Sequence, residues 1–328
     1  MENRLIEILK IALAYNVTDI HFTLSRSNAE NVDIEMRVSG TMRKLKSKEG
    51  DYRFFRYLMY RANLDISNVL VPQTGSFEQT VDSKNISLRF ALVSSYYRTS
   101  GVLRILNNHP SLSIDELTAQ KDAAEWMKKI TGHASGLFVF TGPTGSGKTT
   151  SLYTILNACE GKKIFTLEDP VEIVNDRYVQ LQINERQNLS YASGIKQLMR
   201  HDPDILMIGE IRDEPAAQMA VRSALTGHLV VTSLHSSSCV SAIQRLEDLG
   251  VQKLQLADVL YGISSQRLFD TGNGKRTGIY EFMNRKEIIH YFETEKTSSG
   301  FVPLSTAIRN AETAGIITSR QAEAYLLE

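Results

Sequence analysis

The sequence contains little cysteine, no long apolar run and no excess of charge of either sign. Its 328 residues include two cysteines, Cys159 and Cys239, too few for a disulfide framework or a four-thiolate zinc site. No run of about 18 apolar residues occurs, so no segment is expected to span a membrane. Lysine plus arginine and aspartate plus glutamate both number 37, whereas proteins that bind nucleic acid non-specifically carry a positive field. We therefore expect a protein of the cytoplasm, a reducing compartment, with no direct nucleic-acid partner.

The length and composition are those of a globular protein with about two domains. Hydrophobic residues make up 42% and charged residues 23% of the chain, which is ordinary for such proteins. Residues 1–16 predict an amphipathic helix rather than a signal peptide, because charged residues interrupt the apolar stretch. The apolar residues at helical spacing in this segment are Leu5, Ile8, Ala12 and Tyr15.

Strand patterns dominate residues 18–106. Apolar and polar residues alternate with a period of two at 32–38 and 86–92, as in half-buried strands. Ser39-Gly40 predicts a turn into a hairpin partner, TMRKLK, and 53–63 predicts a helix. The first domain, residues 1–106, is therefore expected to be a small antiparallel α+β domain.

A polar segment with one proline follows, and the pattern then changes. Residues 107–116 are the predicted linker, and Ser113 and Glu116 have the spacing of a capping box at a helix start. In residues 117–328 short apolar strands alternate with helical patterns, which predicts a parallel sheet covered by helices. These strands are expected at 137–140, 163–167, 205–208 and 229–232.

The segment GPTGSGKTT fits the phosphate-loop pattern G-x-x-x-x-G-K-[ST]. An apolar strand precedes it and a helical stretch follows it, which is the expected context. Glycines allow backbone N–H groups to converge on phosphate, and the helix N-terminus adds a favourable dipole. We expect Lys148 to bind the β- and γ-phosphates of ATP and the Thr149 hydroxyl to bind Mg²⁺. The predicted nucleotide-binding residues are Gly142, Pro143, Thr144, Gly145, Ser146, Gly147, Lys148, Thr149 and Thr150.

Two acidic segments follow apolar strands downstream of this loop. In an open α/β sheet, ligands bind at the carboxyl ends of strands, so Glu210 in GEIRD is expected beside the phosphate loop. Glu210 could hold Mg²⁺ through water or orient the attacking water; the alternative is an ordinary surface acid. Three acids in five residues at a strand end, Glu168, Asp169 and Glu172 in TLEDPVE, suit cation binding. We predict Asp169 as a Mg²⁺ ligand and Glu168 as a catalytic residue. The alternative there is a solvated turn built on Asp-Pro.

His228 and His235 flank the apolar segment LVVTSL. Single histidines are usually structural, but two of them around one strand, with Thr226-Gly227 before it, resemble a site that senses phosphate. Their separation and lack of further ligands make a metal site unpersuasive.

These four segments, in this order, resemble the secretion ATPase superfamily of type II secretion and type IV pilus systems. The segments are GPTGSGKTT, TLEDPVE, GEIRD and ALTGHLVVTSLH, and Gln266-Arg-Leu268 and RTGIYE extend the resemblance. It implies an α/β fold, with a RecA-like P-loop NTPase domain after a smaller PAS-like α+β domain, and a homohexamer. The small size, with no N-terminal extension, looks most like the competence-pilus assembly ATPase of Gram-positive bacteria.

The resemblance also implies arginines that act from the N-terminal domain. Arg104, in the strand VLRIL, matches the family's central arginine, and Arg89 stands where an Arg-Val-Ser strand would begin. Arg98 is a third candidate, and the alternative for each is a surface strand residue. The family's Gly-Glu pair is absent, with Thr99-Ser100-Gly101 in its place. Many relatives carry four cysteines near Gln-Arg-Leu; this chain has none there, so we predict no zinc.

The function expected is ATP hydrolysis that drives assembly of a competence pilus, a pseudopilus or type II-like secretion. Resemblance implies peripheral association with the inner face of the cytoplasmic membrane, through an integral inner-membrane platform protein. Two alternatives remain open. One is a nucleotide-dependent switch or scaffold with negligible hydrolysis, against which Glu210 argues. The other is a RecA-like DNA motor, which the balanced charge disfavours.

Overall fold

The computed structural model describes residues 1–15, 17–25, 28–38, 41–106, 112–184, 188–272 and 275–326. The chain divides into two compact units, Met1–Pro110 with Glu172–Val174, and Ser111–Val171 with Asn175–Glu328. The predicted linker falls partly outside the described residues, at 107–111, so the predicted domain boundaries stay a prediction.

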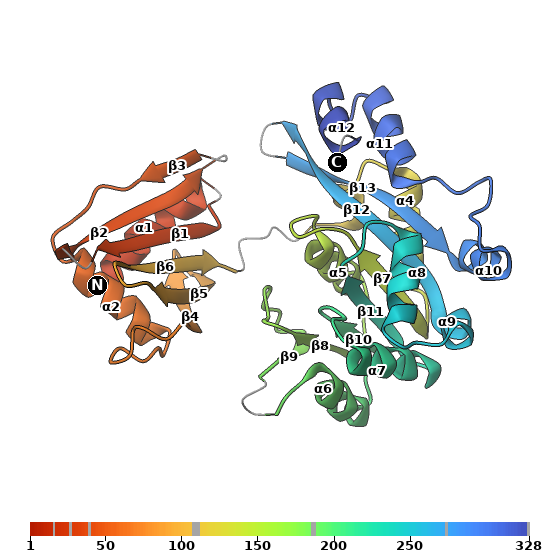
Figure 1. Cartoon of the computed structure of the whole chain (residues 1–328), viewed down its shortest axis with the longest axis horizontal. Helices are drawn as coiled ribbons and strands as arrows, with labels where there is room; N and C mark the ends of the chain where they lie inside the picture. Colours follow the sequence, from red (N-terminus) through yellow and green to blue (C-terminus); the bar gives the residue numbers. More distant parts are fainter. Residues whose placement is uncertain are drawn as a thin grey trace. The chain divides into compact units, whose positions relative to one another are not determined.

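The first unit is a six-stranded antiparallel sheet with two helices, drawn in red to yellow in Figure 1. Its strand order is β3-β2-β1-β6-β5-β4. The expected helix at 53–63 and the hairpin partner of the second strand are confirmed, whereas β4 carries a weak pattern and was not predicted. Ser39-Gly40 lies outside the described residues. The elements are α1 (Glu2–Ala14), β1 (Asp19–Ser25), β2 (Asn28–Val38), β3 (Thr41–Lys44), α2 (Asp51–Arg61), β4 (Gln73–Val81), β5 (Lys84–Ser94) and β6 (Arg98–Ile105).

Both helices of this unit contribute to one core on one face of the sheet. Strand β1 alternates between buried and half-buried positions, so the opposite face of the sheet carries polar side chains. The core includes a cluster of phenylalanines from strands and helix with tilted or edge-to-face rings, Phe22, Phe54, Phe55 and Phe90. Helix α1 buries Leu5, Ile8, Leu9 and Ala12. Tyr15, expected on that face, instead follows the last residue of the helix and is exposed.

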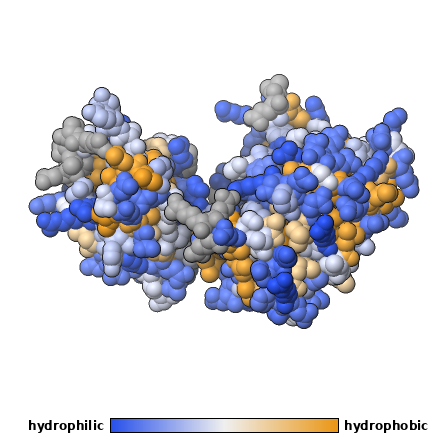
Figure 2. Space-filling view, turned by 60° about the horizontal axis from the view of Figure 1, so that its bottom comes forward, coloured by the Kyte–Doolittle hydropathy of each residue, from blue (hydrophilic) through white to orange (hydrophobic). Residues whose placement is uncertain are grey.

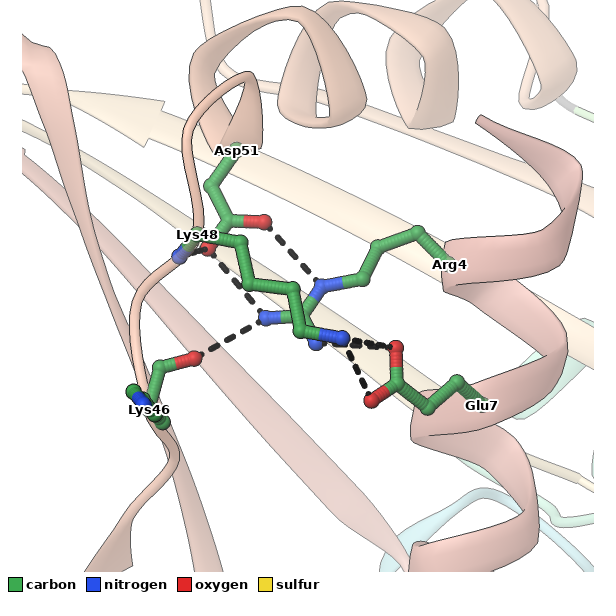
Figure 3. A network of polar contacts seen from close by, with 5 residues as sticks. All are labelled: Arg4, Glu7, Lys46, Lys48 and Asp51. Carbon is green, nitrogen blue, oxygen red and sulfur yellow. Dashed lines mark hydrogen bonds and ion pairs between the residues drawn. The ribbon is translucent and has the colours of Figure 1, made fainter.

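A polar network joins α1 to the start of α2 (Figure 3). The guanidinium of Arg4 donates to both carboxylate oxygens of Asp51, at 3.1 and 3.2 Å, and to the carbonyl oxygen of Lys46 at 3.1 Å. The Asp51 side chain is only 3% exposed, whereas that of Glu7, which pairs with Arg4 and Lys48, is 41% exposed. Asp51 and Arg4 therefore form the buried part of the network, and Glu7 forms its solvated edge.

The second unit is a seven-stranded sheet with helices on both faces, drawn in yellow to blue in Figure 1. The strand order is β13-β12-β7-β11-β10-β8-β9; β12 and β13 are antiparallel, and all other neighbours are parallel. The four predicted strands are confirmed as β7, β8, β10 and β11. Strands β9, β12 and β13 were not predicted.

The strands of this unit are β7 (Gly136–Thr141), β8 (Ile164–Glu168), β9 (Tyr178–Gln182), β10 (Ile205–Ile208), β11 (Leu229–Leu234), β12 (Leu260–Gly272) and β13 (Lys275–Asn284). The helices are α3 (Ile114–Leu117), α4 (Lys121–Ile130), α5 (Lys148–Asn157), α6 (Tyr191–Leu198), the 3₁₀ turn η2 (Met199–His201), α7 (Glu214–Leu225), α8 (Cys239–Asp248), α9 (Lys253–Val259), α10 (Arg285–Thr294), α11 (Leu304–Thr313) and α12 (Ser319–Leu326). The capping box predicted at Ser113 and Glu116 is present at the start of α3.

One buried carboxylate joins two of these helices to β13. The side chain of Glu281, in RTGIYE, is buried, and its two oxygens accept backbone N–H bonds from Cys239 at 2.7 Å and Leu304 at 2.8 Å. Cys239 and Leu304 are the first residues of α8 and α11. A carboxylate is stabilising at a helix N-terminus, because unpaired N–H groups and the helix dipole favour negative charge there. Glu281 serves two helices in this way.

Hydrophilic side chains cover most of the face drawn in Figure 2, and hydrophobic ones gather in separate patches. The most exposed large apolar side chains are Leu254, Tyr96 and Tyr97. Within the part of the chain described, no helix combines the length and apolar composition needed to cross a bilayer.

The Arg4–Asp51 pair gives a stability prediction. Changing Asp51 to Ala leaves a largely buried guanidinium without its carboxylate, which should lower the free energy of unfolding by about 3–5 kcal/mol. The matched change Glu7→Ala removes the solvated partner and should cost at most about 1 kcal/mol. Urea denaturation of the full chain, with hydrogen exchange of α1 and α2 amides, measures both. Equal losses in the two variants would contradict the assignment of Asp51 as the anchoring carboxylate.

Candidate nucleotide-binding site

The predicted phosphate loop connects the end of β7 to the start of α5. Its glycines adopt the left-handed backbone conformation, with φ of 142° at Gly142, 79° at Gly145 and 90° at Gly147. A Cβ atom at Gly142 would lie 2.6 Å from the carbonyl oxygen of Gln266, so the loop also has no room for a side chain there. Such turns direct successive N–H groups into a concavity that binds anions. The loop therefore has the backbone form that a phosphate group requires.

Lys148 is the first residue of α5, and its ammonium group lies within the loop. The Nζ atom donates to the carbonyl oxygens of Gly142 at 2.8 Å and Pro143 at 3.0 Å. The side chain is largely buried, whereas Pro143, Thr144 and Gly145 are exposed. The site thus combines a fixed positive charge at a helix N-terminus with an accessible loop, an arrangement that favours a phosphate ligand.

The parallel strands place the predicted acids at the same edge of the sheet as the loop. Residue Thr141, at the end of β7, is the register partner of Leu234, at the end of β11, and Leu167 of β8 is the partner of Ile208 of β10. Residues that follow these strands therefore emerge at the carboxyl edge, where ligands bind in such sheets. This edge carries the phosphate loop, Glu168, Asp169, Glu210 and His235.

Glu210 lies between two basic side chains. Its carboxylate forms an ion pair with Arg212, and its second oxygen lies 3.4 Å from Nε2 of His235. Arg212 also donates to Asp169 at 2.8 Å. The hydrogen bond with Glu210 raises the pKa of Arg212, so this guanidinium stays charged. The structure thus brings together three of the predicted residues, Glu210, Asp169 and His235, around an arginine that sequence reasoning did not select.

Glu168 has a different environment from Glu210. It is buried at the end of β8, and its Oε1 atom accepts hydrogen bonds from Thr166 at 2.6 Å and Tyr153 at 2.7 Å. Burial, followed by the charge of Glu168, raises the pKa of Tyr153, so the phenol stays protonated and donates. Gln180 of β9 donates to the same phenol at 2.7 Å. These contacts favour a structural role for Glu168, joining β8 and β9 to α5; catalysis by Glu168 stays a prediction.

The two predicted histidines do not share one site. His235 follows β11 at the carboxyl edge, but His228 precedes β11, where its carbonyl oxygen accepts from the N–H of Gly136 at the start of β7. The six residues of β11 separate them by about 20 Å. Nδ1 of His228 contacts Thr226 and the carbonyl oxygen of Ser223, which closes the end of α7. The expectation of a joint two-histidine site is therefore corrected: His235 lies near Glu210 and His228 does not.

Two of the three predicted arginines of the first unit are neighbours on its sheet. Arg89 of β5 is the register partner of Arg104 of β6, which in turn faces Asp19 of β1. Arg104 pairs with Asp19 at 2.7 Å. Arg98, at the other end of β6, lies about 20 Å away along the strand. Arg89 and Arg104 thus form one basic position on the polar face, and Arg98 is separate from it.

Mg²⁺ suits the donors present beside the loop. Among the described residues, no three or more histidine, cysteine, aspartate or glutamate side chains are grouped closely enough to hold a metal ion by themselves. Mg²⁺ usually keeps several waters and binds one or two protein oxygens together with substrate phosphates. The Thr149 hydroxyl on the first turn of α5 and the Glu210 carboxylate are donors of that kind.

The loop, the helix that it starts and the parallel sheet define the class of P-loop nucleotide-binding proteins. Residues 1–303 match the family described as type II/IV secretion system protein, and the chain belongs to this family. The predicted family and fold class are thereby confirmed.

Curated relatives come from several bacteria. The chain is 30% identical to the competence protein ComGA of Bacillus subtilis over 344 aligned residues, covering 97% of this chain and 96% of that protein. It is 37% identical to a putative type II secretion system protein E of Escherichia coli, covering 80% of this chain and 53% of that protein. The chain therefore spans nearly all of the first relative and about half of the second.

Solved structures support the fold. The pilus retraction motor PilT with bound ADP gives a TM-score of 0.76 at 24% identity, covering 97% of this chain and 95% of that one. The Legionella pneumophila ATPase DotB gives a TM-score of 0.76 at 18% identity, covering 100% of this chain and 96% of that one.

The contacts of Glu168 give a second prediction. Changing Tyr153 to Phe removes a buried hydrogen bond to a carboxylate, so the free energy of unfolding should fall by about 2 kcal/mol. Turnover of ATP at saturation should stay within about twofold, because Glu168 keeps its position through Thr166. The matched control Tyr178→Phe removes a bond to the neutral amide of Asn157 and should cost about 1 kcal/mol. Denaturation and phosphate release test both; lost turnover at unchanged stability would instead favour catalysis by Glu168.

Proposed function

We propose that the protein is an ATP-hydrolysing motor that drives assembly of a competence-type pilus or pseudopilus, or a related secretion system. The observation that carries the proposal is the phosphate loop, with three left-handed glycines and a lysine ammonium inside it, at the edge of the sheet where Glu210 lies. The names of the relatives support the kind of system in which the motor acts, since one is a competence protein and others belong to type II secretion.

In this proposal the residues of the loop and of the same sheet edge divide the tasks of phosphoryl transfer. The loop N–H groups and Lys148 hold the β- and γ-phosphates, and the Thr149 hydroxyl, with Glu210 or Asp169, faces Mg²⁺. When bound, Mg²⁺ neutralises charge on the phosphates. Glu210 orients the attacking water, and Arg212 and His235 hold the Glu210 carboxylate in place. This assignment fits phosphoryl transfer, in which positioning and charge stabilisation supply most of the catalysis.

In this scheme the N-terminal arginines supply the positive charge that stabilises the γ-phosphate during transfer. We assign Arg104, with Arg89 beside it, as the cation that approaches the γ-phosphate when the N-terminal unit closes within a homohexamer. An arginine in that role is worth about 10³–10⁵ in rate. Arg104 is paired with Asp19 at the surface, and such exposed pairs are weak, so exchange of Asp19 for a phosphate oxygen costs little. In this scheme, hydrolysis of ATP lets the N-terminal unit move away from the phosphate loop again, and this movement does work on a partner protein.

The partner in this proposal is an integral platform protein of the inner membrane, which the motor meets from the cytoplasm. Nucleic acid is not a direct ligand in this scheme, because neither sign of charge is in excess. A salt-dependent titration with DNA distinguishes the alternative of a DNA motor, and pull-down of membrane partners from native cells identifies the platform.

The carboxylate of Glu210 provides the direct test of hydrolysis. Glu210→Gln should bind ATP with wild-type affinity and lose turnover by at least about 100-fold, because the amide orients water poorly. Lys148→Ala should lose binding itself. Phosphate release and equilibrium binding of ATP separate the two effects. Wild-type turnover in Glu210→Gln would remove Glu210 from the mechanism, and no turnover in the wild-type protein would favour a nucleotide-dependent switch.

Assembly gives a further prediction. If Arg104 acts only in the closed ring, the rate per subunit should rise with protein concentration, and Arg104→Gln should lower the rate of the assembled protein by about 10³-fold or more. The matched control is Arg53→Gln, an exposed arginine on α2 of the same unit, which should leave the rate unchanged. A stable monomer that hydrolyses ATP as fast as the ring would contradict the scheme.

A further inference from the structure

Gln266 of β12 lies directly beneath the phosphate loop. Its side chain is only 1% exposed, and its amide nitrogen donates to the carbonyl oxygen of Ser146 at 2.7 Å. These two residues are 120 positions apart, so the contact joins the antiparallel edge of the sheet to the loop between β7 and α5. Gln266, which lies outside the phosphate loop, therefore holds the backbone of that loop.

The loop is packed closely against this glutamine. A Cβ atom at Gly142 would lie 2.6 Å from the backbone oxygen of Gln266, and one at Gly147 would lie 3.3 Å from its side-chain nitrogen. Leu268, two positions along the same face of β12, would meet the Gly147 Cβ only at 3.9 Å. Leu268 fills space at this surface with an apolar side chain. The polar amide of Gln266 therefore contributes something besides packing.

The direction of one peptide bond explains that purpose. The only cis peptide bond among the described residues precedes Pro170, so the bond from Ser146 to Gly147 is trans. In a planar trans peptide the C=O and the following N–H point in opposite directions. Because the Ser146 carbonyl points down to Gln266, the N–H of Gly147 points away from β12, to the side of the loop on which a phosphate binds.

A glycine at this position makes an anchor necessary. Gly147 has φ of 90°, and a residue without Cβ adopts either sign of φ with similar ease. A flip of the Ser146–Gly147 peptide would turn the carbonyl oxygen of Ser146 toward the phosphate and the N–H of Gly147 away from it. We propose that Gln266 is a positioning residue that prevents this flip and so keeps the Gly147 N–H available as a phosphate donor.

Gln266 uses one end of its amide within the described part of the chain. Among the described residues, neither Oε1 of Gln266 nor Oγ of Ser146 has a hydrogen-bond partner, although both atoms are buried. Buried polar groups are normally paired. The amide of Gln266 thus acts on its surroundings through its donor, which fixes the loop peptide.

The inference rests on the proposed nucleotide site, and the test separates the two. Gln266→Met keeps the length of the side chain and removes the donor. The dissociation constant for ADP should rise about tenfold, equivalent to about 1.4 kcal/mol, with a parallel loss for inorganic pyrophosphate as competitor. Since the N–H contact is present in ground and transition states alike, KM for ATP should rise while kcat stays within about threefold.

The matched control is Gln120→Met. The Gln120 amide also holds backbone of this hairpin, accepting from the N–H of Tyr280 at 2.6 Å and donating to its carbonyl oxygen at 3.2 Å, without touching the loop. Its loss should lower the melting temperature and leave ADP affinity within about twofold of wild type.

The outcomes are distinct. Failure of the wild-type protein to bind ADP would overturn the proposed function itself. If the wild-type protein binds ADP and a folded Gln266→Met protein binds it with the same affinity, this inference alone is overturned. If Gln266→Met does not fold, Gln266→Asn, whose amide is one methylene too short to reach Ser146, takes its place with the same expected loss. If neither variant folds, Gln266 is a core residue and the assignment is wrong.

Discussion

The strands β7, β8, β10 and β11 run in one direction, so everything that follows them emerges at one edge of the second unit's sheet. Parallel pairing therefore gathers groups that are far apart in sequence: the phosphate loop, two acidic segments and His235. The same geometry removes His228 from the site, because it precedes its strand. A buried parallel sheet also demands apolar strands, and the polar chemistry is consequently confined to strand ends.

The strand ends were accessible to sequence reasoning, because a short apolar run followed by Gly-Lys-Thr or by acids is a local pattern. The four central strands and the loop could be predicted for that reason. Strands β12 and β13 were missed although they pair with each other, because β12 begins directly after the last residue of α9, with no turn residue to mark its start. Gln266 and Arg212 stand inside quoted motifs, yet their roles depend on a carbonyl and a carboxylate that only the fold brings near.

In the first unit, two arginines on neighbouring strands lower the stability of the sheet. Arg89 and Arg104 are direct cross-strand partners, and like charges in that position destabilise a sheet. Asp19, the next partner in the row, offsets part of this repulsion through its pair with Arg104. The two arginines concentrate positive charge on the polar face of this sheet, opposite the core on its other face.

The shared carboxylate of Glu281 has a consequence for how the end of the chain can vary. Its two oxygens serve the first turns of α8 and α11 at once, so the helix that follows His235 and the helices nearest the C-terminus have a common anchor. A version of this protein shortened before Leu304 would leave one oxygen facing the core with no donor. The start of α11 is in this sense a constituent of the nucleotide-binding unit, and a change that removes the N–H of Leu304 must supply another donor to the same acid.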